Sequence, residues 1–254
     1  MSGKAVDGGN LLLGKGKVYF DRFDGAGARV GERFLGNVEE LTINTTDNLV
    51  EKYSSADAEA GLIASVNTRR LAEFGMKLSE FDAENVALAM MGDTALQAQT
   101  GAAVTGEAIA DVKQGYYYPL LYRQVSLVTV TDGASVTYDV TDDYEIDAVS
   151  GRIYIVPGGA ITEASDIEVD YTYATISLQK VTAGTAGTID GYLRFIGDPA
   201  HGPVWELEVW HLQISPDGNI PMIGEDYASF GIKGKVIQEA AAHPSEPYFR
   251  AIKR

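Results

Sequence analysis

The segment Gly9–Lys15 has the glycine and lysine spacing of a phosphate-binding loop, in which backbone N–H groups hold the phosphates of a nucleotide. The next residue is Gly16, where that motif needs a serine or threonine hydroxyl to bind magnesium. No strand pattern precedes the segment and no amphipathic helix pattern follows it. We therefore interpret residues 1–13 as an N-terminal arm that leads into the first strand, and we expect no cofactor.

Other side chains with catalytic or metal-binding potential are few. His201, His211 and His243 lack the spacing of zinc ligands, and the chain has no cysteine. The acidic run 139–147 lacks the ligand spacing and the glycine of an EF-hand loop, so solvated turns explain it better than calcium binding. These residues predict no metal site.

One pair of carboxylates has a spacing that is used in catalysis. Glu206 and Glu208 share one side of an alternating strand, about 7 Å apart, which falls in the range of inverting glycosidases. The same spacing is common on any exposed strand, so it does not identify an active site. We expect no catalytic residue and predict that the protein is not an enzyme.

The chain is strongly acidic, with a formal net charge of −16. Such a chain does not wrap nucleic acid by neutralising phosphates, although an acidic wall would keep passing DNA from adhering. Ten acidic residues and one arginine between Thr129 and Tyr173 supply −9 of this charge. The N-terminus lacks a signal-peptide pattern, and Leu11–Leu13 is too short to span a membrane, so we expect a soluble protein without a membrane partner.

The spacing of apolar residues predicts a mainly β protein. Residues 17–23 and 28–36 are expected to form a hairpin around a glycine-rich turn. Residues 38–46 alternate as a half-buried strand, and residues 67–78 resume that pattern. The intervening stretch 47–66 is polar and has no sustained period, so it is predicted to be a long loop.

A single helix is predicted at residues 82–91. Asp82 is a favourable N-cap, the following residues are good helix formers, and Gly92 provides a C-terminal stop. Val86 and Met90 lie on one helical face, which we expect to pack on the sheet.

Short strands between turn signals predict an inserted module at residues 116–180. Pro157–Gly159 is one such turn signal. We expect this module to be a small β-sandwich. The main domain would then comprise residues 14–115 and 181–254, and its longer strands would resume near residue 191.

The order of these motifs resembles the major tail tube protein of bacteriophages with long, non-contractile tails. The similar features are Gly14–Phe20, a turn, Arg33–Val38, an alternating strand, a long loop, a second strand and a short capped helix. The resemblance covers residues 10–92 and, less clearly, 186–240. The individual motifs are short, so the resemblance depends on their order.

The resemblance implies a fold of two packed antiparallel sheets, a tail-tube β-sandwich or split barrel, with one flanking helix. It implies a structural virion protein that is made in the bacterial host cytoplasm and self-assembles into hexameric rings. The rings would stack into a tail tube through which double-stranded DNA passes during ejection, without sequence-specific binding. Its implied partners are other copies of itself, the tape measure protein, the tail terminator and the distal tail proteins.

The same resemblance implies which residues contact neighbouring copies. The long loop and the N-terminal arm would reach adjacent subunits, and the inserted module would lie on the outside of the tube. The candidates for subunit and inter-ring contact are Leu11, Leu12, Leu13, Leu49, Val50, Glu51, Tyr53, Leu62 and Ile63. Glu206 and Glu208 are the candidate acidic residues facing the channel.

A different class of function is also open to this sequence. The aromatic residues Tyr116, Tyr117, Tyr118 and Tyr122, with the acidic module 116–180, would suit a carbohydrate-binding or adhesive β-sandwich protein. In that case the inserted module would be the binding site. Calcium-dependent glycan binding would distinguish this alternative from self-assembly.

Overall fold

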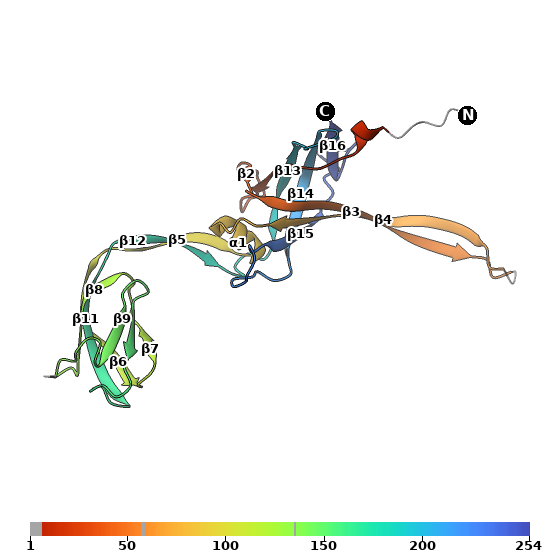
Figure 1. The fold of residues 1–254 in the computed structure, drawn as a ribbon. Coiled ribbons are helices and arrows are strands. Elements are labelled where there is room, and N and C mark those ends of the chain that lie inside the picture. The colour runs from red at the N-terminus through yellow and green to blue at the C-terminus, as the bar shows by residue number, and fades with distance from the viewer. Residues whose placement is uncertain (1–6, 57–58, 135) are drawn as a thin grey trace. The chain divides into compact units, whose positions relative to one another are not determined.

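The computed structural model describes residues 7–56, 59–134 and 136–254 and divides the chain into two compact units (Figure 1). Unit 1 comprises the residues up to Ala95 and those from Val181 onward, and unit 2 comprises Leu96–Lys180. Each unit has its own hydrophobic core. The expected mainly β fold is confirmed, with several antiparallel sheets and, in the described residues, a single α-helix.

Unit 1 is built on one eight-stranded antiparallel sheet. Seven strands follow the order β2-β1-β13-β14-β15-β4-β3, and β16 pairs with β14 off this path. The strands are β1 (Gly16–Arg22), β2 (Arg33–Phe34), β3 (Val38–Tyr53), β4 (Leu62–Leu78), β13 (Ile189–Gly197), β14 (Trp205–Asp217), β15 (Phe230–Val236) and β16 (Phe249–Lys253).

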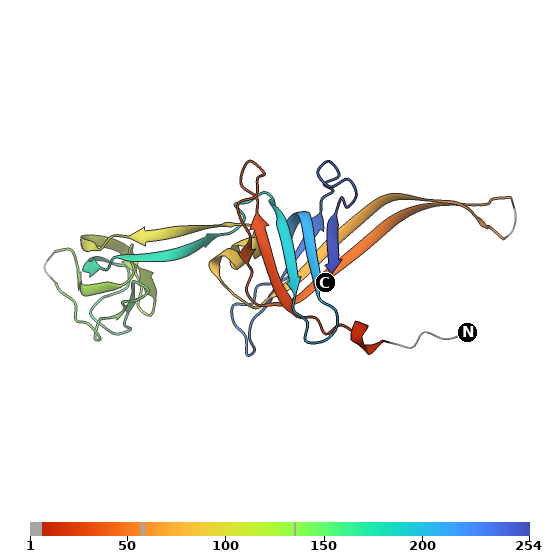
Figure 2. The ribbon, with the colours of Figure 1, turned by 90° about the horizontal axis from the view of Figure 1, so that it is seen from above.

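The sheet of unit 1 branches at β14. One edge of β14 pairs with β16 along Trp205–Val209 and with β15 along Leu212–Asp217. A long strand can serve two partners in this way because successive segments of its edge are free to bond. The branch lets the sheet enclose a core, in which Phe74 of β4 meets Phe249 of β16 edge-to-face at 6.0 Å (Figure 2).

The helix α1 (Ala83–Ala89) lies inside the range expected for it. Its N-cap is Asp82, whose side chain accepts a hydrogen bond from the Asn85 N–H at 2.6 Å. The buried face differs from the expected one, because Asn85 and Leu88 are buried while Val86 is only half-buried. Asn85 turns inward since it donates to the Leu35 carbonyl at 2.9 Å and accepts from an arginine of β2.

Unit 2 contains two three-stranded antiparallel sheets, β7-β10-β9 and β6-β11-β8. Ile153, Ile155 and Ile167 are among the buried residues between them. The strands are β6 (Ala102–Val112), β7 (Tyr117–Pro119), β8 (Val125–Thr131), β9 (Tyr144–Asp147), β10 (Arg152–Ile155) and β11 (Ser165–Tyr173). Two further strands, β5 (Asp93–Gln99) and β12 (Ile176–Thr182), pair with each other where the chain passes between the units.

The expected start of the inserted module was wrong. Unit 2 begins at Leu96 instead of residue 116, because β6 pairs with β11 throughout its length and belongs to that unit. The segment around β6 is mostly exposed, so its alanines and threonines show little apolar alternation. The end of the module near Lys180 coincides with the end of unit 2.

The expected loop at residues 47–66 is largely regular strand. β3 continues to Tyr53 and β4 begins at Leu62, so that only the short connection between them lies outside strands. Neither face of this part of the hairpin is buried, and the sequence therefore lacks the alternation by which a half-buried strand is recognised.

Candidate functional site

Strands β3 and β4 form a hairpin with two structurally different parts. In the base, residues 38–46 and 71–78, β4 pairs with β15 as well as with β3. Beyond Glu73 the pairing with β15 ends, and residues 47–53 and 62–70, which we call the distal hairpin, form a two-stranded ribbon. The distal hairpin is drawn in orange in Figures 1 and 2 and extends roughly 30 Å, at about 3.3 Å per residue.

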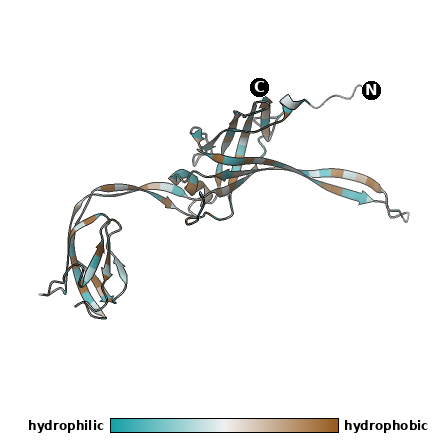
Figure 3. Cartoon of the chain, in the orientation of Figure 1, coloured by the Kyte–Doolittle hydropathy of each residue, from teal (hydrophilic) through white to brown (hydrophobic). Residues whose placement is uncertain are grey.

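Apolar side chains are exposed over the whole distal hairpin. Their exposed fractions lie between 50% and 66%, and the residues are Leu49, Val50, Tyr53, Leu62, Ile63 and Val66. Figure 3 shows hydrophobic stretches, in brown, along this ribbon. All of these residues except Val66 are candidates expected from the sequence, and the structure brings them together on one element.

The register divides the distal hairpin into two faces. Val50 lies opposite Val66, and Lys52 lies opposite Ala64, so these four residues share one face. Leu49 lies opposite Asn67 on the other face. The first of these faces thus combines apolar side chains with one ammonium group.

Local hydrogen bonds support the ribbon. Arg70 donates to the Asp47 carboxylate at 3.0 Å, and this bond, followed by one from Asn67, holds the pKa of Asp47 below its usual range. The hydroxyl of Tyr53 donates to the carboxylate of Glu51, which raises the pKa of Tyr53. These contacts are exposed, so they add little to stability.

The edges of the distal hairpin are open. Among the described residues, no strand pairs with the outer edge of β3, and none pairs with the far edge of β4 beyond Glu73. Unpaired edges offer rows of N–H and C=O groups to another chain. A two-stranded ribbon with exposed apolar side chains is marginally stable alone, so this element is suited to contact with another molecule.

The described part of the N-terminal arm, from Asp7, is attached to unit 1 by its backbone. The Leu13 N–H donates to the His201 carbonyl at 2.9 Å, and His201 Nε2 lies 2.9 Å from the Gly8 carbonyl oxygen. The side chains of Leu11, Leu12 and Leu13 nevertheless point outward and are more than half exposed. The arm is therefore a second exposed apolar segment on the same unit. The expectation for residues 1–6 of the arm lies outside the described residues.

Glu206 and Glu208 are not the free acidic groups that we expected. Each is only 7% exposed. Arg194 reaches both carboxylates at 3.3 Å, Arg254 pairs with Glu206 at 2.5 Å, and Arg250 donates to Glu208 at 2.9 Å. Since each carboxylate has two arginine partners, the pair presents little negative charge to solvent. These arginines lie on distant segments, which is why sequence spacing alone misses them.

This ion-pair network shifts the titration of its members. Burial alone would raise the pKa of Glu208, but the hydrogen bond from Arg250 and the charge of Arg194 bring it below its usual range. Burial, followed by the charge of Glu208, raises the pKa of Tyr192 to about 12. The arrangement stabilises the ionised form of Glu208, as expected of a structural ion-pair network. A general acid would instead need a raised pKa, so that it holds a proton at neutral pH.

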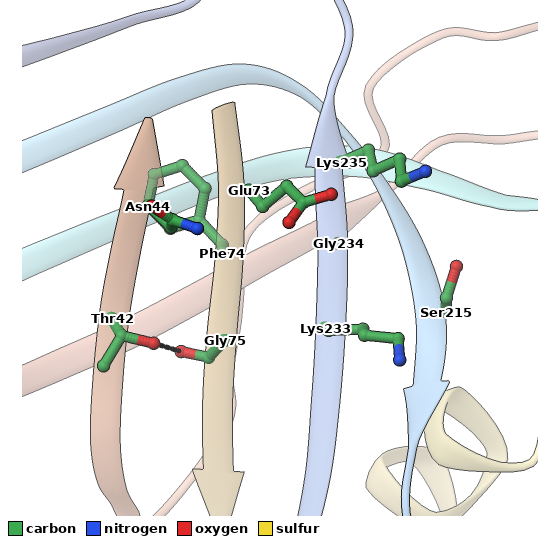
Figure 4. Close-up of a pocket in the computed structure, with 9 residues that line it drawn as sticks. All are labelled: Thr42, Asn44, Glu73, Phe74, Gly75, Ser215, Lys233, Gly234 and Lys235. Atoms are coloured by element: carbon green, nitrogen blue, oxygen red, sulfur yellow. Dashed lines mark hydrogen bonds between the residues drawn. The ribbon is translucent and has the colours of Figure 1, made fainter. Parts of the chain in front are cut away.

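A shallow hollow of about 420 Å³ lies on the outward face of the base (Figure 4). It exists because Gly75 has no side chain there, and a Cβ would come within 2.7 Å of the Thr42 hydroxyl. Figure 4 shows Glu73, Lys233 and Lys235 around it. These mixed charges on an open sheet face resemble a solvated surface, and we assign no reaction to them.

The tyrosines of the inserted module do not form one platform. Tyr116 and Tyr117 are exposed, whereas Tyr118 packs against the core of unit 2 and its hydroxyl accepts the Lys113 N–H at 2.6 Å. Tyr122 stacks on Tyr173 with ring centroids 3.7 Å apart. Of the four tyrosines named for the carbohydrate-binding alternative, Tyr116 and Tyr117 are the two that are more than half exposed.

Two acidic residues of unit 2, Asp143 and Asp147, form hydrogen bonds with backbone N–H groups of loops. Asp143 accepts backbone N–H groups of Ala160 at 2.6 Å and Asp139 at 2.9 Å, and these bonds lower the pKa of Asp143. Asp147 pairs with Arg152 at 2.6 Å, and this bond, with bonds from Ser150, lowers the pKa of Asp147 to about 2. Within the described part of the chain, no group of three or more His, Cys, Asp or Glu is arranged to hold a metal ion.

The sequence matches a family model described as "Protein of unknown function UCP028589" over residues 11–248. The chain belongs to this family. The UCP028589 match spans both units and includes the whole distal hairpin. No curated protein matches the sequence. In the described ranges, no helix of this UCP028589 member is long and apolar enough to cross a membrane.

Proposed function

We propose that this protein is a structural subunit that assembles with copies of itself into stacked rings, forming a tube of the kind found in long, non-contractile phage tails. The observation that carries the proposal is the distal hairpin, a two-stranded ribbon with open edges and exposed apolar side chains on both faces. Burying each such side chain fully contributes about 1.5–3 kcal/mol, less the cost of ordering the contact. Under this proposal, the surface that covers the hairpin comes from a second copy of the same chain, so that no other protein is needed for this contact.

Three features of unit 1 support the proposal together. The outer edge of β3 is available for pairing, the arm exposes Leu11–Leu13, and the distal hairpin reaches beyond the sheet. Six copies joined edge to edge, as the resemblance implies, would form each ring, and hairpins and arms would connect the rings. The channel so enclosed would pass double-stranded DNA.

The electrostatics of this proposed channel differ from those first expected. Glu206 and Glu208 are neutralised by arginines, and the outward face of the base mixes lysines with acidic residues. Lys77 pairs with Glu39 at 3.3 Å and Lys233 pairs with Asp217 at 3.3 Å. If this face lines the channel, its near-neutral surface would let DNA slide because it offers no run of unpaired cations.

The test compares the wild-type protein with a variant in which residues 49–68 are replaced by a two-residue Asn-Gly turn. This change joins Asn48 to Arg69, which lie opposite each other in the register, so the base keeps its pairing. Negative-stain images of concentrated wild-type protein should show rings or tubes, and the shortened protein should fold without forming tubes. A wild-type protein that stays monomeric at every concentration would contradict the proposal.

A further inference from the structure

The loop between β14 and β15, residues 218–229, exposes large apolar side chains to an unusual degree. Ile223 is 98% exposed, Tyr227 is fully exposed and Met222 is 68% exposed. Glu225 and Asp226 lie between them in the sequence and form no ion pair with any residue that the structure describes. Several large apolar side chains exposed in one short loop favour an interaction site. Sequence reasoning missed it because the loop lies outside every periodic segment.

The β14–β15 loop and the distal hairpin lie at opposite ends of the same sheet. The loop ends at Phe230, which pairs with Leu78, and Leu78 is opposite Val38, the first residue of β3. The distal hairpin departs from the other end of β3 and β4. The views in Figures 1 and 2 agree with this placement within unit 1.

The two surfaces match in chemistry as well as in position. One face of the distal hairpin presents Val50 and Val66 together with Lys52, which forms no ion pair with a described residue. The loop presents Ile223 and its apolar neighbours beside two unpaired carboxylates. Apolar side chains would meet apolar side chains, and the ammonium group of Lys52 would meet a carboxylate that forms no ion pair with a described residue of its own protomer.

We propose that the β14–β15 loop of one copy is the docking site for the Val50–Val66 face of the distal hairpin of the next copy. The inference rests on the proposed function and names the partner surface of the hairpin. Because the two surfaces differ and lie at opposite ends of the sheet of unit 1, the contact is heterologous and does not close on a pair of molecules. Every copy then points in the same direction along the stack.

Crosslinking tests the contact directly, because the chain has no cysteine of its own. Protein carrying Val50→Cys is mixed with protein carrying Ile223→Cys, assembled, and treated with a short bis-maleimide crosslinker. We expect a crosslinked dimer that requires both variants, and a ladder of multimers when one chain carries both substitutions. Leu49→Cys is the matched control, because Leu49 lies on the opposite face of the hairpin, and its yield with Ile223→Cys should be several-fold lower.

Charge reversal tests the same contact without a crosslinker. Lys52→Glu should raise the protein concentration needed for tube formation about tenfold, because like charges would then face each other. Adding Glu225→Lys and Asp226→Lys to this variant should restore assembly. Arg69→Glu, a charge reversal elsewhere on the hairpin, should not be rescued by the loop substitutions.

The outcomes separate this inference from the function on which it rests. Wild-type tubes without a crosslink between positions 50 and 223, or without rescue of Lys52→Glu, would overturn the docking site and leave the tube proposal standing. Wild-type protein that never assembles would overturn both. A crosslink that favours position 49 over position 50 would contradict the assigned face.

Discussion

The base and the distal part of one hairpin place the same two strands in different surroundings. In the base, Ala72, Phe74, Met76 and Leu78 of β4 alternate inward and are buried in the core of unit 1. In the distal hairpin, β4 from Leu62 to Leu71 is exposed at every position. The backbone pairing between β3 and β4 continues through both parts, so burial is what changes along the strands.

This difference separates a segment that is buried within the protomer from a segment to which we assign assembly under the proposed function. The apolar residues of the base are buried within the protomer, because β15 and the core of unit 1 cover them. The apolar side chains of the distal hairpin are exposed in the protomer, and under the proposed function a second copy covers them. Substitutions in the two parts should therefore separate stability of the protomer from its assembly.

The largest expected effect is on protomer stability. Phe74→Ala should lower the free energy of unfolding by about 3–5 kcal/mol, because it leaves a cavity beside Phe249 in a closed core. Leu49→Ala should change it by about 0.5 kcal/mol or less, since Leu49 is exposed in the protomer. Urea denaturation below the assembly concentration measures both, and equal losses would erase the distinction between the two parts.

A second prediction concerns hydrogen exchange of the backbone amides. In unassembled protein, amides of the base should be strongly protected, and amides of residues 49–53 and 62–67 should exchange at least about a hundredfold faster, because a two-stranded ribbon opens locally. Assembly should slow exchange of the distal amides while the base changes little. Mass spectrometry of peptic fragments resolves the two parts, and distal amides already protected in the protomer would argue against a need for a partner.

The smallest expected effect is on the pKa of Asp47, which lies where the base meets the distal hairpin. The bond from Arg70 favours the ionised form of Asp47, so its contribution is present above the ordinary pKa near 4 and is lost as pH falls through the lowered pKa. Arg70→Gln should raise the pKa of Asp47 towards its ordinary value, as measured by NMR titration of the carboxyl carbon. Arg69→Gln is the control, because Arg69 forms no ion pair in the described structure, and it should leave the titration of Asp47 in place.

The sequence predicted those parts of the fold that local patterns determine. Alternation located β4 up to Leu78, and the N-cap Asp82 located α1. Alternation did not reveal strand where no face is buried, and so residues 47–53 and β6 were missed as strands. The branching of the sheet at β14 depends on which distant strands pair, and no local pattern encodes that choice.

The candidate contact residues also show what sequence reasoning can and cannot predict. The resemblance implied that the stretch 47–66 contacts neighbouring copies, and Leu49, Val50, Leu62 and Ile63 are apolar residues of that stretch. All four are exposed in the protomer. A search for apolar residues within residues 218–229 would have identified Ile223. Glu206 and Glu208 failed as free acids because their arginine partners come from β13, β16 and the C-terminal residue.

The pairing of β5 with β12 has a consequence for how this protein can change over time. The chain leaves unit 1 and returns to it on two adjacent strands, so unit 2 occupies a gap that a tight turn would close. Replacing unit 2 between β5 and β12 would leave the order of the strands of unit 1 intact. It would also change the entropic cost of closing the chain between these two strands only slightly. Unit 2 can therefore be replaced or removed in principle while the strand order of unit 1 stays the same.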